Sequence, residues 1–505
     1  MSKLKKILCI LLLAALIAAV SSCASEESGS ADNGEVNPAG AAGDTDEPDA
    51  GVPGGGESAD RWAQEPHNLP ETDFGGRDFN VITVEVADAN RMYDKFSADE
   101  QTGEPINDAM YKRRLDIEEQ YKIKLNTVIN AAPADVARRS IMAGDMQYDL
   151  IVDIIWRTKN LGSQRLLADL YTVPYIKDNL GKPWWDQALS RDLSINGKLF
   201  FQTGNIVLRD KLRIAVMYFN KDLFKTVGLD YPYQCVYDGT WTIDKLVELT
   251  KGVNADLNGD GVMNEYDQWG LMSQHANGLH MFSASGERTI SLDKNGVPEI
   301  TINTDRAIAV IQKVLDVSTD GVTMFHADTI KGSSDIWIQA SAYFQENRFL
   351  MRTSVFEPIV RDLRGMPTDF GILPYVKYDE NQEHYYTYVE ENGLVVGIPV
   401  NADAEYSGFI TEALAYASGS TLMPAFYDLC LTSKVLRDDE SEGMLDIIFD
   451  SKVYDIGCIY QIGNLNTILI DLVSSKNTDF VSRYESRQGA AESALQKFIE
   501  SYDQD

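Results

Sequence analysis

Cysteine and histidine are scarce in this chain, with 5 of each among 505 residues. Cys235, Cys430 and Cys458 are widely spaced, so they indicate neither a disulfide framework nor a zinc site, although a Cys430–Cys458 bridge stays open. The histidines show no metal-ligand spacing either, since His275 and His280 do not share a helical face. Composition therefore offers no cysteine-based or histidine-based chemistry.

Signatures of catalysis are also missing. The stretch "SASGERT" from Ser283 to Thr289 is not a G-x-S-x-G elbow, and the chain has no P-loop or dinucleotide fingerprint. Carboxylate pairs for glycoside cleavage stay open, because their spacing is three-dimensional. We therefore expect no catalytic residues and a protein that is not an enzyme.

Basic residues are also few compared with acidic ones. The chain has 45 Lys and Arg against 77 Asp and Glu, a formal net charge of −32. Nucleic acids and anionic lipids both need basic patches on their partners. The charge therefore argues against nucleic acid and anionic lipid as partners.

The N-terminus has the features of a lipoprotein signal peptide, residues 1–22. A basic start precedes an apolar run, Ile7 to Val20, that is too short to span a membrane comfortably. The four residues that end at Cys23 resemble a bacterial lipobox, after which Cys23 would be lipidated. The alternative is an ordinary secretory signal cleaved near Ala24. We expect a protein anchored by lipid at the extracellular face of the cell membrane.

A disordered acidic stalk is expected next, over residues 23–73. Its Gly, Ser, Ala, Pro, Asp and Glu cannot bury enough apolar surface to offset the entropy of ordering. Such a stalk would hold the rest of the chain, from 74 to 505, away from the membrane.

The segment from 74 to 505 is longer than one core usually supports, so two lobes are expected. Strand and helix patterns alternate along it, which predicts α/β lobes with parallel sheets covered on both faces. The tail from Glu405 onward is mostly helical. We predict strands at 76–86, 123–129, 148–154 and 212–220, helices at 106–123, 134–144 and 242–253, and a helix that runs into a strand at 335–355.

Several stretches carry a family resemblance in shared order and spacing. They are "YDLIVDIIW" with the later "LLADL", "MYFNKDLFKTVGLDYP", "WTIDKLVELTK" and "AYFQENRFLM", in which Asn347 stands where Gly is usual. The chain thus resembles the extracellular solute-binding proteins, family 1, of carbohydrate ABC transporters, the maltose-binding-like group.

The resemblance implies a type II periplasmic-binding-protein-like fold, with two α/β lobes, a central cleft and hinge crossings. We assign 74–215 and 335–380 to the N-terminal lobe, and 216–334 and 381–505 to the C-terminal lobe. It also implies a monomer that captures a carbohydrate, in particular an oligosaccharide, by lobe closure. The expected partners are this carbohydrate and the membrane permease subunits of an ABC importer.

Sugar sites combine flat aromatic rings with carboxylates and amides. Several such residues lie where predicted strands end, the place where open α/β sheets bind ligands. The expected ligand-binding residues are Tyr93, Asp153, Trp156, Trp185, Ser285, Gly286, Trp337, Phe356, Glu357 and Asn392.

The stretch "DLNGDGVMNEYD", residues 256 to 267, has the ligand spacing of a calcium loop. The predicted ligands are Asp256, Asn258, Asp260, Asn264 and Asp267, with the backbone oxygen of Val262. Asp in place of Glu at the last position predicts weak binding, and a lone loop predicts a structural brace rather than a sensor. The alternative is an acidic surface turn capped by its own side chains.

Three other functions stay open on the sequence. They are a surface polysaccharide-processing enzyme, an adhesive or scaffolding lipoprotein, and a binding protein for a peptide or another non-sugar solute. Turnover of a glycan would favour the first of these, and the absence of any stabilising sugar would favour the second.

Overall fold

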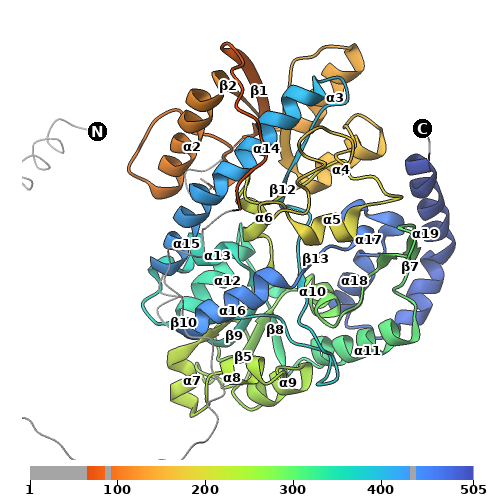
Figure 1. Cartoon of the computed structure of the whole chain (residues 1–505). Coiled ribbons are helices and arrows are strands. Elements are labelled where there is room, and N and C mark those ends of the chain that lie inside the picture. Colours follow the sequence, from red (N-terminus) through yellow and green to blue (C-terminus); the bar gives the residue numbers. More distant parts are fainter. Residues whose placement is uncertain (1–64, 86–92, 433–438, 504–505) are drawn as a thin grey trace, which may run out of the picture. The chain divides into compact units, whose positions relative to one another are not determined.

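The computed structural model describes residues 65–85, 93–432 and 439–503 (Figure 1). The expected signal peptide, Cys23 and residues 23–64 of the expected stalk lie outside the described residues. No helix in the described part of the chain is both long and apolar enough to cross a bilayer. Residues 65–73, which the sequence assigned to the stalk, instead contact the folded part. Leu69 is buried, and the ring of His67 lies 4.6 Å from that of Tyr416.

The first lobe is built on a four-stranded sheet in the order β12-β3-β1-β2. Its first strand, β1 (Arg77–Val84), pairs in parallel with β2 (Ile123–Asn130) and β3 (Leu150–Ile154). The last strand, β12 (Leu394–Gly397), pairs with β3 in the antiparallel direction. Every residue of β3 is buried, as expected for a strand covered on both faces. The predicted strands at 76–86, 123–129 and 148–154 are thus confirmed.

Helices from both ends of the described chain cover this sheet. They include α2 (Pro105–Tyr121), α3 (Pro133–Ala143), α4 (Ile155–Ser163) and α14 (Ala404–Ser420). Figure 1 shows α14, in blue, beside the red β1, and the ring of Tyr406 packs edge-on against that of Phe79. In α2, Ile117 is buried, whereas Leu115 is 42% exposed and so lies off the inner face.

The second lobe is built on a five-stranded sheet in the order β10-β4-β9-β5-β8. Two neighbouring pairs, β5–β8 and β5–β9, are parallel, whereas β4 is antiparallel to both β9 and β10. The strands are β4 (Ala215–Asn220), β5 (Trp269–Ser273), β8 (Met324–His326), β9 (Phe349–Val355) and β10 (Phe370–Leu373).

This topology corrects the predicted lobe boundaries. The segment 335–380, assigned to the N-terminal lobe, contains β9 and β10, which hydrogen-bond to β4 and β5 in the second sheet. Conversely, β12 and α14 from the segment 381–505 cover or extend the first sheet. The chain therefore returns to the first lobe only at β12, and not after α12 (Ile336–Gln345).

A left-handed residue makes the turn from α12 into β9. Asn347 has a φ of 60°, a conformation that Gly adopts freely and Asn tolerates. Its side-chain oxygen accepts a hydrogen bond from Asn220 Nδ2 at 2.5 Å. Asn347 can thus replace the Gly usual at this position and also ties the turn to the end of β4.

Two described crossings join the lobes side by side. Residues 213–214 lead from the first lobe into β4, and residues 389–393 lead back from the second lobe into β12. Ile214 pairs with Val389 as an antiparallel bridge, and the Glu390 amide donates to the Arg213 carbonyl at 2.9 Å. These paired crossings lie where the resemblance implied a hinge between the lobes.

The remaining elements complete the two lobes. Between α15 and α16, residues 433–438 are outside the described part. The three-residue 3₁₀ helices are η2 (Ala327–Thr329), η3 (Leu363–Gly365) and η5 (Ile462–Asn464), and the short strands are β6 (Ile290–Leu292), β7 (Pro298–Ile300), β11 (Thr387–Tyr388) and β13 (Lys452–Val453). The helices are α5 (Gln187–Leu193), α6 (Arg209–Leu212), α7 (Lys221–Val227), α8 (Tyr233–Tyr237), α9 (Ile243–Thr250), α10 (Asn277–Ala284), α11 (Asp305–Thr319), α13 (Glu357–Arg361), α15 (Leu422–Thr432), α16 (Asp439–Asp450), α17 (Ile456–Tyr460), α18 (Thr467–Ser475) and α19 (Phe480–Asp503).

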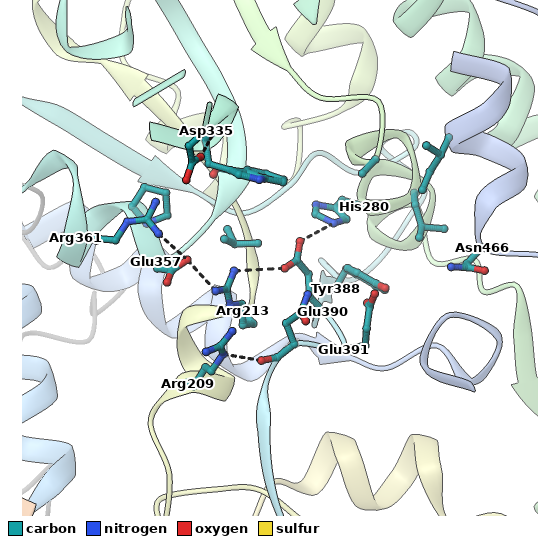
Figure 2. A pocket seen from close by; sticks show the side chains of 18 residues that line it. Arg209, Arg213, His280, Asp335, Glu357, Arg361, Tyr388, Glu390, Glu391 and Asn466 are labelled. Carbon is teal, nitrogen blue, oxygen red and sulfur yellow. Dashed lines mark hydrogen bonds and ion pairs between the residues drawn. The ribbon is translucent and has the colours of Figure 1, made fainter. Parts of the chain in front are cut away.

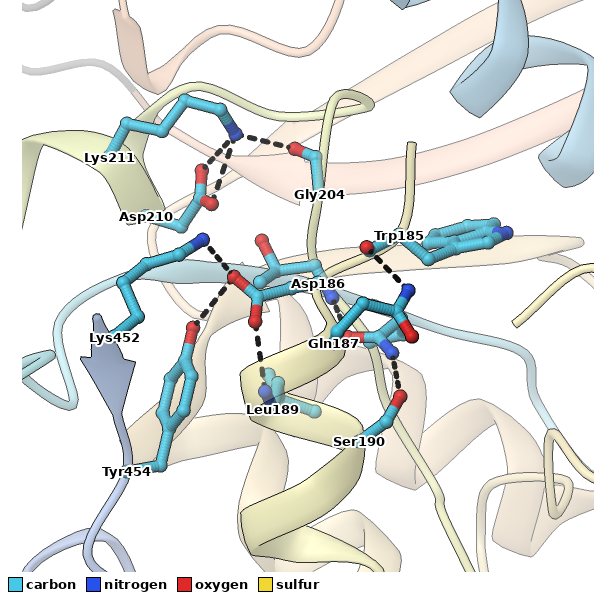
Figure 3. Close-up of polar contacts among 12 residues, drawn as sticks. Trp185, Asp186, Gln187, Leu189, Ser190, Gly204, Asp210, Lys211, Lys452 and Tyr454 are labelled. Atoms are coloured by element: carbon cyan, nitrogen blue, oxygen red, sulfur yellow. Dashed lines mark hydrogen bonds and ion pairs between the residues drawn. The ribbon is translucent and has the colours of Figure 1, made fainter. Parts of the chain in front are cut away.

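A buried charge cluster ties the C-terminal segment to the first lobe (Figure 3). Asp186, the N-cap of α5, pairs with Lys452 of β13 and accepts a hydrogen bond from the Leu189 amide at 2.8 Å. Beside it, Lys211 lies 3.0 Å from Asp210 and also donates to a backbone carbonyl. Two carboxylates thus meet two ammonium groups, as buried charges require.

Cys235, Cys430 and Cys458 form no disulfide within the described part of the chain. Cys430 and Cys458 are buried, and Cys235 is partly exposed. The bridge that the sequence left open is therefore not formed.

Candidate functional site

A cavity of about 390 Å³ lies where the hinge meets the second lobe (Figure 2). One wall comes from the two crossings and α6, and the other comes from the carboxyl end of β9, the starts of α10, α12 and α13, and α18. Most of its lining residues are polar or charged, and one is an exposed indole. The lining residues are Arg209, Arg213, Ala276, Leu279, His280, Asp335, Trp337, Ser354, Val355, Glu357, Pro358, Arg361, Tyr388, Glu390, Glu391, Asn392, Asn466 and Ile470.

Arg213 links the two walls of this cavity. Its guanidinium lies 3.0 Å from Glu357, the first residue of α13, and 3.9 Å from Glu390 on the returning crossing. Arg361 lies 3.5 Å from Glu357 and pairs with Asp362 at 2.7 Å. Arg209 pairs with Asp94 at 2.5 Å. Each arginine of the cavity is therefore matched by a carboxylate.

Burial changes the protonation of two facing groups. His280 Nε2 lies 3.5 Å from Glu390, and its ring stacks on that of Tyr388 at 5.0 Å. Burial lowers the pKa of His280 to about 3, so the imidazole is neutral at pH 7. Burial also raises the pKa of Glu390 to about 7, although Arg213 opposes this shift. Close to neutral pH, Glu390 can therefore act as a hydrogen-bond donor or acceptor.

Groups that suit an uncharged polar guest lie around these ion pairs. Trp337 is 43% exposed at the start of α12, where Asp335 caps the helix by accepting its amide at 2.9 Å. Asn466 Oδ1 and Ser354 Oγ are buried polar atoms without a hydrogen-bond partner in the described part of the chain. The site thus offers an exposed flat ring, with unsatisfied polar atoms buried in two of its lining residues.

Three of the ten predicted ligand-binding residues line the cavity. They are Trp337, Glu357 and Asn392. They come from α12, from α13 and from the returning crossing, so the fold brings together residues from separate segments.

The structure places four of the others inside the protein. The indole of Trp185 donates to Glu412 at 2.8 Å, and Phe356 packs against Phe426 and Phe449. Asp153 accepts the Ala134 amide at 3.0 Å. Tyr93 is buried as well. None of these four lines the cavity.

The last three predicted residues lie outside the cavity lining. Ser285 lies at the end of α10, where its buried hydroxyl donates a hydrogen bond to the Met281 carbonyl at 2.9 Å. The next residue, Gly286, has a φ of 89°. Trp156 is 39% exposed at the start of α4, and its amide donates to the Glu391 carbonyl at 3.1 Å. Trp156 therefore lies on the first lobe, next to the returning crossing.

The predicted calcium loop folds around its own polar side chains. Asp256 accepts amides of Gly259 and Gly261, and Asn258 and Asp260 accept amides further along the loop. Asp267 is buried and accepts amides from Leu257 and Asn264. Asn264 also donates to the Val262 carbonyl at 2.9 Å. The loop is thus closed by hydrogen bonds to its own polar side chains, as in the acidic turn that the sequence left as the alternative.

Sequence reasoning missed most of the charged lining. Adjacent charges such as Glu390 and Glu391 usually lie in solvent, but the crossing buries Glu390 against Arg213. Arg209, Arg213, His280 and Arg361 were not predicted. One available signal was the position of Arg213, two residues before the predicted lobe boundary at 215.

The site can now be compared with known proteins. A sequence model of the family described as bacterial extracellular solute-binding protein matches residues 98–316. No curated protein matches the sequence.

Several solved structures share the fold. The maltose-binding protein MalE from Listeria monocytogenes in complex with maltose has 15% identity and a TM-score of 0.55, over 83% of this chain and 98% of that one. A cyclo/maltodextrin-binding protein complexed with maltotetraose has 15% identity and a TM-score of 0.55, over 85% and 99%. The MalE domain from Bdellovibrio bacteriovorus bound to maltotriose has 14% identity and a TM-score of 0.50, over 83% and 99%.

At such low identities these structures show the fold alone, and that fold is the predicted one, with two α/β lobes joined by crossings. The family match and the shared fold support the resemblance found in the sequence: residues 98–316 match the model of the bacterial extracellular solute-binding proteins, and the chain has the fold of the maltose-binding proteins.

Proposed function

We propose that this protein captures a carbohydrate, in particular an oligosaccharide, in the cavity at its hinge and delivers it to an ABC importer. The observation that carries the proposal is the composition of the cavity: the exposed Trp337 beside Asn392, Asn466 and paired charges. The solved proteins of the same fold that were bound to maltose, maltotriose or maltotetraose give independent support.

The chemistry of the cavity favours a neutral polyhydroxylated guest. Sugar rings have apolar faces that stack on an indole, and hydroxyl groups that pair with carboxylates and amides. An anionic guest would have to compete with Glu357, Glu390 and Asp94 for the arginines that they already pair with. A neutral sugar can instead accept and donate hydrogen bonds at the rims of these ion pairs.

Closure of the lobes would complete the site. Trp156 of the first lobe is exposed beside the returning crossing and does not line the cavity. A rotation about the paired crossings would bring this second indole toward the guest, opposite Trp337. Two facing rings would suit a chain of several sugars better than a single ring.

The experiment that tests this function is a thermal-shift panel of mono- and oligosaccharides, run with calcium present. A ligand at 100 times its Kd adds about 2.7 kcal/mol to the free energy of unfolding. We expect at least one oligosaccharide to raise the melting temperature. Stabilisation only by peptides, or by no solute at all, would contradict the proposal.

One observation favours a second function, a polysaccharide-processing enzyme. A glutamate with a pKa of about 7 in a sugar-sized cavity matches what a general acid needs. The family and the solved structures of this fold are binding proteins, which supports binding without turnover. Product analysis after long incubation with the stabilising glycan separates the two functions, and we expect the glycan to be recovered intact.

We also propose that the loop from Asp256 to Asp267 binds Ca²⁺ as a structural brace. Its ligand spacing supports this, and so does Gly261, whose φ of 77° permits the sharp turn. The residues that would hold the ion are Asp256, Asn258, Asp260, Val262, Asn264 and Asp267. The ion would join α9 to β5, away from the cavity lining.

We propose a lipid anchor at Cys23, a position at the extracellular face of the membrane, and a monomer that meets the permease subunits of its importer. The lipobox-like sequence and the family support this proposal. Metabolic labelling with a fatty acid should mark the protein, and the Cys23→Ser variant should stay unlabelled. Light scattering after gel filtration should give the mass of one chain.

A further inference from the structure

Two histidines and an aspartate meet on the second lobe, at the edge where two neighbouring strands end. His326 is the last residue of β8, and Asp328 lies in η2, which follows directly. His275 lies just after β5, and the strands are parallel with Ser273 opposite His326. Since parallel strands end at the same edge of a sheet, the fold gathers residues whose spacing in the sequence shows no metal pattern.

One ligand atom from each of these three residues lies within 4.8 Å of the other two. His275 Nδ1 lies 3.8 Å from Asp328 Oδ1, and the two imidazole rings are 4.9 Å apart. Asp328 Oδ2 accepts the His275 amide at 2.8 Å, so the carboxylate is already held against the His275 loop. No other group of three His, Cys, Asp or Glu comes this close within the described ranges.

The tautomer of His326 is fixed by its backbone contact. His326 Nε2 lies 2.7 Å from the Ser318 carbonyl oxygen, which can only accept, so Nε2 carries the proton. The opposite nitrogen, Nδ1, then has a free lone pair, is buried and has no hydrogen-bond partner among the residues described. Metal-binding histidines usually donate their second N–H to a carbonyl or carboxylate in this way.

We propose that His275, His326 and Asp328 bind a transition-metal dication, with Zn²⁺ the best match. Two imidazole nitrogens and one carboxylate oxygen suit Zn²⁺, whereas Ca²⁺ prefers oxygen alone. Ligand atoms about 2.1 Å from a tetrahedral ion are about 3.4 Å apart, so binding needs a small inward shift. The loop of His275 and the partly exposed Asp328 have the freedom to make it, and the site is independent of the proposed sugar function.

The ion would lie beside the cavity, because Ala276, the next residue after His275, is part of the cavity lining. Three protein ligands leave one position on Zn²⁺ for water or for an oxygen of a bound solute. The site could therefore hold the β5–α10 and β8–η2 loops together at the rim of the cavity.

Cobalt titration of the intact chain tests this site. The protein is treated with EDTA, dialysed, and titrated with Co²⁺ in buffer that contains calcium, so that the calcium loop is filled. We expect visible absorption of tetrahedral Co²⁺ that saturates at one equivalent and is removed by Zn²⁺, which binds more tightly. Absence of such a band, or titration without saturation, would overturn the proposal.

Variants link the band to these residues. Asp328→Asn keeps a side-chain oxygen that can accept the hydrogen bond from the His275 amide. His275→Gln changes only a side chain in a loop. Both variants should therefore keep the wild-type melting temperature in EDTA. Each should weaken Co²⁺ binding at least about tenfold. His384→Gln, which changes an exposed histidine outside the site, is the control and should bind as the wild type does. Wild-type affinity in both Asp328→Asn and His275→Gln, or an equal loss in His384→Gln, would overturn the proposal.

Discussion

The Arg213 guanidinium lies 3.0 Å from the Glu357 carboxylate and joins the first lobe crossing to the segment that follows β9. The same guanidinium faces Glu390 on the returning crossing. The charges of the cavity and the hinge are therefore one network. Under the proposed function, lobe closure would therefore rearrange the ion pairs of Arg213.

Removal of the exposed indole should weaken sugar binding with little effect on the fold. We expect Trp337→Ala to lower the affinity for the stabilising oligosaccharide at least tenfold, about 1.4 kcal/mol, because the stacking surface is lost. Calorimetric titration measures this. Ile338→Ala is the matched control, since Ile338 is the next residue, is 54% exposed and does not line the cavity. Equal losses in the two variants would rule out stacking on Trp337.

Glu390 should make the protein less stable as the pH rises. Its pKa is about 7 in the folded state and about 4.3 in an unfolded chain. Between these values the folded state binds more protons, so the free energy of unfolding falls as pH rises from about 4.3 to 7. The loss attributable to Glu390 is about 4 kcal/mol at most.

Urea unfolding across this pH range checks the prediction. Glu390→Gln should flatten the curve, whereas Glu383→Gln, at an exposed glutamate, should leave it unchanged. Glu412, whose pKa burial also raises to about 7, acts in the same direction and should keep part of the slope in Glu390→Gln. A Glu390→Gln curve with the full wild-type slope would show that Glu390 does not titrate in this window.

Glu412 should be a stability residue rather than a binding residue. It is fully buried, and its two oxygens accept the indole N–H groups of Trp184 and Trp185 at 2.7 Å and 2.8 Å. Glu412→Leu leaves both donors unpaired, at about 1–3 kcal/mol each. Denaturant unfolding should show this loss, and sugar affinity should stay unchanged.

Glu405→Ala provides the control on the same helix, because Glu405 is exposed in the first turn of α14. It should change the free energy of unfolding by no more than about 0.5 kcal/mol. A loss of sugar affinity in Glu412→Leu at full stability would instead place the tryptophan pair in the binding site.

Calcium removal should lower the melting temperature more than it lowers sugar affinity. The proposed loop lies away from the cavity lining, and Ca²⁺ at ten times its Kd adds about 1.4 kcal/mol. Asp256→Ala should abolish the difference between EDTA and calcium buffers. Asp293→Ala, in an acidic turn that lacks the calcium spacing, should retain it. If the melting temperature of the wild type does not depend on calcium, the loop is a capped acidic turn and not a calcium site.

Local periodicity was enough to predict the strands and helices but not the lobes that they join. The strands at 123–129 and 148–154 alternate or run apolar in ways that depend only on their own residues. The position of β9 depends instead on its pairing with β4 and β5, which are distant in sequence. This is why the segment 335–380 was assigned to the wrong lobe.

The site shows the same limit at the level of single residues. Phe356 and Glu357 are adjacent, yet Phe356 packs in the core and Glu357 lines the cavity. The residue types near a strand end indicate that one of these two residues faces the ligand, but they do not indicate which one. The meeting of His275 with His326 is also invisible in the sequence, because it depends on two strands that lie side by side.

The most direct test of the central claim is calorimetric titration of the best sugar from the thermal-shift panel into wild type and the Trp337→Ala/Asn392→Ala variant. We expect one sugar molecule bound per wild-type chain, and an affinity lowered at least a hundredfold, about 2.8 kcal/mol, in a variant that still folds. Equal affinity in the two proteins, or no binding of any sugar to the wild type, would contradict it.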